Sequence, residues 1–66
     1  MYQEYQQRVI NEKSELDEKR ANLAKFLETK GFYNLHVDEQ ARMRYQAVAM
    51  REYSAVLGER IAHFKP

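Results

Sequence analysis

The chain has no cysteine, one proline and two glycines among its 66 residues. The absence of cysteine excludes disulfides, and the two histidines lack the neighbouring ligand residues that a structural zinc site needs. A phosphate-cradling glycine loop is also excluded, because only Gly31 and Gly58 are present. A chain this short buries only about 60% of its unfolded surface. Self-association is therefore the remaining way to bury more of it.

No sign of charge dominates, since eleven basic side chains face ten acidic ones and the net charge is +1. That balance disfavours a duplex-binding protein, which normally carries a basic excess on one face. Long hydrophobic runs are also missing, so no stretch approaches the roughly 20 apolar residues of a membrane span. The N-terminal segment MYQEYQQR is unlike a signal peptide or an anchor. We expect a soluble cytoplasmic protein with no membrane partner.

Apolar residues recur every seven positions in both halves of the chain. The rows are Tyr2, Val9, Leu16 and Leu23, and then Met43, Met50, Leu57 and Phe64. Seven-residue spacing is typical of helices packed side by side. If the chain folds back at Gly31, the rows face each other in pairs, from Leu23 with Met43 to Tyr2 with Phe64. The sequence therefore predicts an all-α fold, an antiparallel two-helix hairpin that resembles a coiled coil.

The hairpin is predicted to be a single domain over residues 1–66. Helix one is expected at about 2–29, because this segment lacks glycine and proline and is rich in good helix formers. Gly31, preceded by a cation, is expected to end it in a left-handed conformation. The connection then covers about 30–36. Helix two is expected at about 37–64, with two acidic residues in its first turn.

A second row of residues is predicted to border the contact between the helices. In helix one it contains Tyr5, Glu12, Lys19 and Phe26, and in helix two Ala47, Ser54 and Ile61. The middle of the hairpin then pairs charged residues with small ones. One interpretation is a close helix approach with the charged heads reaching out to water. The other is a recess lined by Glu12, Lys19 and Ser54.

Helix two has a second apolar face, formed by Tyr45, Ala49, Tyr53 and Val56. A helix that is apolar on two sides, with one partner helix in its own chain, is expected to bury the second side against another subunit. The sequence therefore predicts a homo-oligomer, either a dimer or a larger ring. The alternative is a monomer with a partly exposed tyrosine stripe.

The residues give little support to catalysis. Hydrolytic or transfer chemistry needs a nucleophile held by a base, paired carboxylates or a metal cage. The two serines, Ser14 and Ser54, have no histidine at helical spacing, and His36 and His63 fall at opposite ends of the hairpin. We therefore expect no enzyme activity, no cofactor and no metal.

Binding of a small, anionic, aromatic ligand is better supported, because basic residues lie close to several of the five tyrosines. Tyrosine rings stack on nucleobases, and arginine forks bind phosphate through two hydrogen bonds. The candidate ligand-binding residues are Tyr5, Arg8, Glu12, Lys19, Arg44, Tyr45, Arg51 and Tyr53. Ordinary subunit packing by the tyrosines and salt bridges by the basic residues remain the alternative for each.

Two blocks, YQQRVINEKSELDEKRANLAKFL and DEQARMRYQAVAMREYSAVLGERIAHF, resemble a family of very short proteins from tailed phages and prophages. The family is related to a crAss-like phage protein and is described as phage nucleotide-binding. Similar small helical phage proteins act as sponges, which assemble into oligomers and sequester nucleotide signals of bacterial immunity. No binding motif of the family maps onto individual residues here.

The resemblance implies a non-catalytic protein that works in the cytoplasm of the infected bacterium. Its ligand would be a nucleotide-derived immune messenger, either a cyclic oligonucleotide or an ADP-ribose derivative. The alternative is an oligomeric interaction module that regulates a host or phage protein through the charged face of helix one. Nucleic-acid binding is a third possibility, disfavoured by the near-zero net charge.

Overall fold

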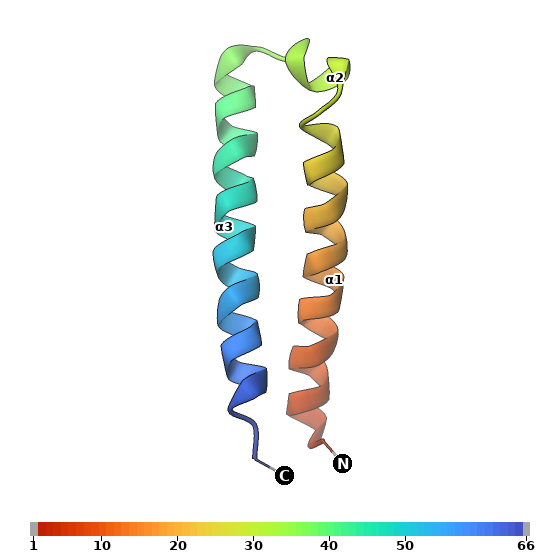
Figure 1. Cartoon of the computed structure of the whole chain (residues 1–66), viewed down its shortest axis with the longest axis vertical. Coiled ribbons are helices and arrows are strands. Elements are labelled where there is room, and N and C mark those ends of the chain that lie inside the picture. Colours follow the sequence, from red (N-terminus) through yellow and green to blue (C-terminus); the bar gives the residue numbers. More distant parts are fainter. Residues whose placement is uncertain (1, 66) are drawn as a thin grey trace.

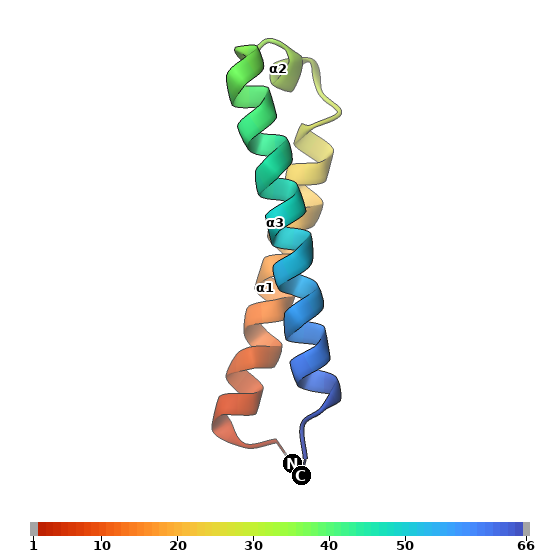
Figure 2. The same ribbon diagram turned by 90° about the vertical axis from the view of Figure 1, so that its left-hand side faces the viewer.

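The computed structural model describes residues 2–65, which form two long helices that run antiparallel side by side (Figures 1 and 2). Helix α1 spans Glu4–Phe26, the one-turn helix α2 spans Lys30–Tyr33, and α3 spans Val37–Ala62. The hairpin is a rod whose Cα atoms extend over 48 × 14 × 13 Å. The predicted all-α hairpin is confirmed, whereas its assembly into a homo-oligomer stays a prediction.

The connection differs from the expected glycine-terminated helix. Helix α1 ends at Phe26, and the side-chain oxygen of Thr29 accepts a hydrogen bond of 3.2 Å from the Phe32 amide, which starts α2. Gly31 lies inside α2, and no glycine within residues 2–65 has a positive φ. The expectation of a left-handed Gly31 was therefore wrong. The chain instead reverses direction through the one-turn helix α2, whose N-terminus is capped by Thr29.

The first turn of α3 carries the two predicted acidic residues and is capped by the side chain of His36. His36 accepts a hydrogen bond of 3.1 Å from the Asp38 amide at Nδ1, and Asp38 and Glu39 place negative charge near the helix N-terminus. The buried side chain of Gln40 then donates to the carbonyl oxygens of Tyr33 (3.2 Å) and Leu35 (2.9 Å). These bonds tie the connection to α3.

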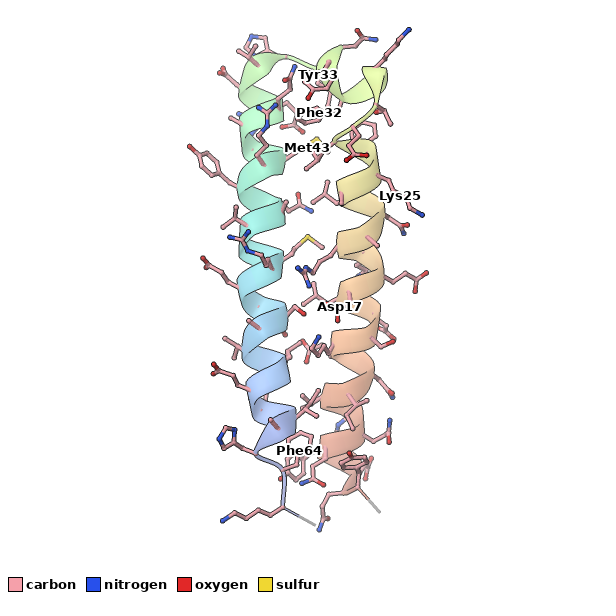
Figure 3. All side chains as sticks on the ribbon, viewed as in Figure 1. Asp17, Lys25, Phe32, Tyr33, Met43 and Phe64 are labelled. Atoms are coloured by element: carbon pink, nitrogen blue, oxygen red, sulfur yellow. The ribbon has the colours of Figure 1, made fainter. Side chains whose placement is uncertain are left out.

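The core is small and follows the predicted seven-residue rows. Val9 and Leu57 are buried where α1 faces α3, and the rings of Tyr2 and Phe64 meet at the open end with centroids 6.2 Å apart. The third buried apolar residue, Phe32 of α2, is completely shielded from water and lies between the long helices at the connected end (Figure 3). The one-turn helix therefore closes the core with an aromatic plug.

The second row of α1 was predicted incorrectly. The side chains that turn toward α3 lie four residues after the first row rather than three, and they are Gln6, Lys13, Arg20 and Leu27. Tyr5, Glu12, Lys19 and Phe26 lie at the edge and are exposed. In a helix of 3.6 residues per turn, residues three and four positions after the first row lie on either side of it, so periodicity alone allows both rows. The row with Lys13 and Arg20 is favoured because both side chains find hydrogen-bond partners there: Lys13 contacts Ser54 of α3, and both donate to Asp17.

Candidate functional site

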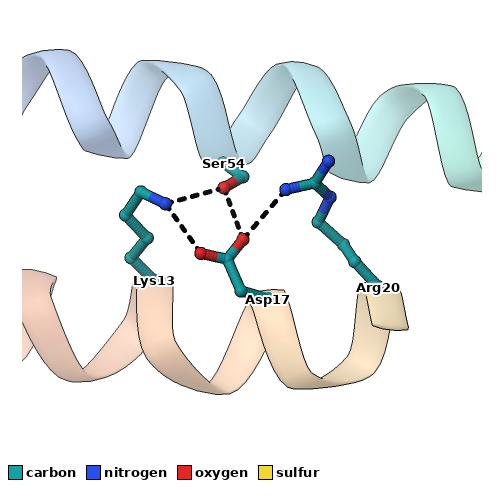
Figure 4. A network of polar contacts seen from close by, with 4 residues as sticks. All are labelled: Lys13, Asp17, Arg20 and Ser54. Atoms are coloured by element: carbon teal, nitrogen blue, oxygen red, sulfur yellow. Dashed lines mark hydrogen bonds and ion pairs between the residues drawn. The ribbon is translucent and has the colours of Figure 1, made fainter. Parts of the chain in front are cut away.

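A cluster of polar side chains joins α1 to α3 at mid-length (Figure 4). Asp17 accepts a hydrogen bond from Lys13 Nζ at 2.7 Å, another from Arg20 at 3.0 Å, and a third from the Ser54 hydroxyl at 2.5 Å. Lys13 Nζ also lies 3.2 Å from the Ser54 oxygen, and Ser54 itself is buried. The carboxylate of Asp17 therefore gathers two cations of its own helix and the one buried hydroxyl of the other.

These contacts strongly favour the ionised form of Asp17. The hydrogen bond from Lys13, followed by those from Ser54 and Arg20, holds the pKa of the Asp17 carboxyl far below its usual range. Burial of the group opposes this effect, and the positive charge of Lys13 adds to it. Asp17 therefore stays negative at any physiological pH and fixes the positions of both cations.

The lowered pKa predicts an acid-sensitive contribution to stability. Because folding lowers the pKa, the unfolded chain takes up the proton first as the pH falls. The contribution is complete above the ordinary range of an aspartic acid and is lost as the pH falls through the folded-state pKa. Asp17→Asn should lower the thermal midpoint at neutral pH and flatten its decline in acid, as circular dichroism would record.

The control for this prediction is Glu15→Gln, which removes an exposed carboxylate that makes no ion pair within residues 2–65. This variant should retain the acid response of the parent protein. If Asp17→Asn and Glu15→Gln lose stability in parallel as the pH falls, the cluster is not responsible for the response.

A recess of about 220 Å³ opens beside this cluster, toward the connected end. Its lining combines an apolar floor with two arginines from opposite helices, and consists of Arg20, Leu23, Ala24, Leu27, Ala47, Val48 and Arg51. Asp17 holds Arg20 from one side, whereas Arg51 makes no ion pair with any residue from 2 to 65. A flat apolar group can rest on such a floor while the guanidinium groups bind an anion.

The structure distributes the predicted ligand-binding residues along the whole rod. Arg51 alone among them lines the recess. On the edge of the hairpin, the Tyr53 hydroxyl donates a hydrogen bond to the Glu12 carboxylate, and Lys19 lies exposed nearby on the same helix as Glu12. Glu12, Lys19 and Ser54 therefore do not form the recess that was one interpretation of the sequence.

The remaining predicted residues lie nearer the two ends. Tyr5 packs edge-on against Phe64 at the open end, with centroids 6.0 Å apart, and Arg8 pairs with Glu4 at 3.6 Å. At the connected end, the Arg44 guanidinium lies 5.0 Å from the centre of the Phe32 ring. The last predicted residue, Tyr45, is exposed on the outside of α3. These side chains do not converge on one site within a single hairpin.

Arg20 is the recess residue that the sequence reading missed. Its signal was present, because Arg20 follows Leu16 of the first apolar row by four residues, as Lys13 follows Val9. The predicted site also lacked the apolar residues of the recess, because Leu23 and Ala47 were expected only to pack between the two helices. A search for charged residues four positions after each apolar row residue finds Lys13 and Arg20 together.

Two other kinds of site find no support in the part of the chain from Tyr2 to Lys65. None of its helices is long and apolar enough to cross a membrane. Over the same residues, no group of three or more histidine or acidic side chains lies close enough to hold a metal ion.

Comparison with known proteins identifies relatives over nearly the whole chain. The Sequestin family model matches residues 3–63. A protein of Enterobacteria phage T4, described as an uncharacterized 7.5 kDa protein in the denB-rIIB intergenic region, is 39% identical over 61 residues, which cover 92% of this chain and 95% of the relative. No solved structure matches. The chain, which is similar to this small phage protein, therefore belongs to the Sequestin family, whose name denotes sequestration.

Proposed function

We propose that this protein sequesters a nucleotide-derived immune messenger in the infected bacterium and so blocks anti-phage signalling. The messenger is a cyclic oligonucleotide or an ADP-ribose derivative. It is bound without chemical change, and the protein works as a homo-oligomer in the host cytoplasm. Membership of the Sequestin family supports the sequestering role. The recess between α1 and α3 supports the nucleotide class of ligand.

The observation that carries this proposal is the pair of arginines beside an apolar floor. A nucleobase is flat and largely apolar on its faces, and a phosphate is an anion that a guanidinium binds with two hydrogen bonds. Arg51 has no carboxylate partner among residues 2–65, so a phosphate would not have to displace one. Sequestration needs only this complementarity, and neither a nucleophile nor a general base is required.

Titration of the purified protein tests the proposal. The ligands are a cyclic dinucleotide, a cyclic trinucleotide, and ADP-ribose with its cyclic isomers, each followed by calorimetry and thermal unfolding. At a free ligand concentration of about 100 times Kd, binding adds about 2.7 kcal/mol of stability. For a domain of this size, that corresponds to a rise of about 10 °C or more in Tm.

Recovery of the ligand separates sequestration from catalysis. After denaturation of the complex, chromatography should return the nucleotide unmodified and in full yield. Absence of heat and of a thermal shift with every class rejects the proposal. A stoichiometric protein partner, captured by an assembly that ignores nucleotides, would favour the interaction module instead.

A further inference from the structure

Arg20 lines the recess with a half-buried side chain whose guanidinium is held by Asp17. Its Nη1 donates a hydrogen bond of 3.0 Å to Asp17 Oδ1, and the side chain is 34% exposed. Figure 4 shows one terminal nitrogen of the guanidinium on the carboxylate and the other directed away from it. A guanidinium carries five N–H donors, so the bond to Asp17 leaves most of them for a second anion. Arg20 can therefore bind a phosphate without releasing Asp17.

Asp17 also ties this arginine to the opposite helix. The Ser54 hydroxyl of α3 donates to the same Asp17 oxygen, Oδ1, at 2.5 Å. Arg20 follows Asp17 by three residues, and Arg51 precedes Ser54 by three. Because the helices run antiparallel, these equal offsets place both arginines at one level, about 4.5 Å along the rod from the Asp17–Ser54 bond. The bond therefore fixes the two arginines relative to each other across the recess that both of them line.

The two guanidinium groups repel each other while the recess is empty. Arg51 makes no ion pair within residues 2–65, so its charge acts on Arg20 without a carboxylate of its own to offset it. Arginine is a long side chain with many rotamers, and without a partner its head turns out to water. Asp17 offsets the repulsion and restricts these rotations. The entropy of ordering Arg20 is then lost on folding rather than on binding.

We propose that Asp17 is a positioning residue for the ligand of the recess, because it keeps the Arg20 guanidinium opposite Arg51 and ready for a phosphate. The inference rests on the proposed function, which supplies the phosphate. In this role Asp17 does not contact the ligand, and its own charge repels an anion. Attraction by net charge alone therefore predicts tighter binding when Asp17 is neutralised, whereas positioning predicts weaker binding.

Asp17→Asn tests the direction of the effect, since asparagine keeps the size of the side chain and removes its charge. Calorimetry with ADP-ribose, cyclic di-AMP and cyclic tri-AMP, below the unfolding transition, should show binding that is about 2- to 12-fold weaker, as expected when one rotamer-rich side chain must be ordered on binding. The control Glu15→Gln neutralises an exposed carboxylate two residues away and should bind as tightly as the parent protein or more so. Unchanged or tighter binding by Asp17→Asn overturns the proposal.

A double-mutant cycle separates positioning from a general effect on the fold. Arg20→Ala removes the group that Asp17 positions, so adding Asp17→Asn to it should weaken binding no further. Losses that add in the double variant mean that Asp17 does not act through Arg20, and they overturn the proposal. Should Asp17→Asn fail to fold, Ser54→Ala keeps every charge and removes only the tie to α3. It should weaken binding by about twofold or more, and equal binding overturns the positioning across the recess.

A measurement without ligand distinguishes failure of this inference from failure of the proposed function. Nitrogen NMR relaxation of Arg20 Nε reports how far the side chain is immobilised on the ps–ns timescale. Its order parameter should be high in the parent protein, fall in Asp17→Asn and stay high in Glu15→Gln. A mobile Arg20 in the parent protein, or one that Asp17→Asn leaves rigid, overturns the positioning role. If Arg20 is held as expected but the parent protein ignores all three probes, the proposed function fails and the positioning of Arg20 stands.

Discussion

Phe32→Ala is expected to remove most of the stability of the hairpin. Phe32 is completely buried, and truncation of a buried phenylalanine costs about 3–5 kcal/mol. A domain of this length has a total stability of about 3–10 kcal/mol. The lost ring also packs edge-on against the rings of Phe26 and Tyr33, with centroids 6.1 and 5.1 Å away. The Arg44 guanidinium lies 5.0 Å from its centre. Urea denaturation followed by far-ultraviolet circular dichroism would measure the loss.

Val37→Ala provides the control for Phe32→Ala, because Val37 is apolar, close to the same connection and 69% exposed. A surface change of this kind alters stability by no more than about 0.5 kcal/mol. If both variants cost the same, the plug formed by α2 does not belong to the cooperative core, and the long helices alone hold the hairpin together. Both measurements need one fixed protein concentration, since association adds to apparent stability.

The importance of Phe32 was not visible in the sequence, for a physical reason. The seven-residue rows predicted the pairs that hold the long helices together, because periodicity reports which side of a helix is apolar. Phe32 lies outside both rows, in a segment that was expected to be an open connection. Its burial depends on the short turn that Thr29 caps with a side-chain hydrogen bond to the Phe32 amide. Short-range capping of this kind carries little periodic signal.

The candidate site shows the same limit. Hydrophobicity favours the row with Tyr5 and Phe26 beside the helix contact, and it disfavours the row with Lys13 and Arg20. The structure selects the second, because Asp17 accepts hydrogen bonds from both cations and Ser54 accepts one from Lys13. Arg51 was among the predicted ligand-binding residues, whereas Arg20 was not. A prediction that counted polar partners as well as apolar matches would have found Arg20, whose partner Asp17 lies three residues before it.

Arg51→Ala is expected to weaken nucleotide binding by about 10- to 150-fold, because a hydrogen bond to a charged group contributes about 1.5–3 kcal/mol. Arg51 makes no ion pair within residues 2–65, so its loss should leave folding intact. Arg51→Lys keeps the charge but loses the planar fork, and it should recover only part of the affinity. Calorimetry with the nucleotide class that saturates the parent protein provides the measurement.

Arg60→Ala is the matched control, since Arg60 is an exposed arginine in the last turn of the same helix, α3, outside the recess and without an ion pair in the described chain. It changes the net charge by the same amount as Arg51→Ala, so any general electrostatic effect on an anionic ligand appears in both variants. A specific phosphate contact predicts that only Arg51→Ala loses affinity strongly. Equal losses would mean that the recess does not hold the phosphate, because long-range attraction alone would then account for the binding.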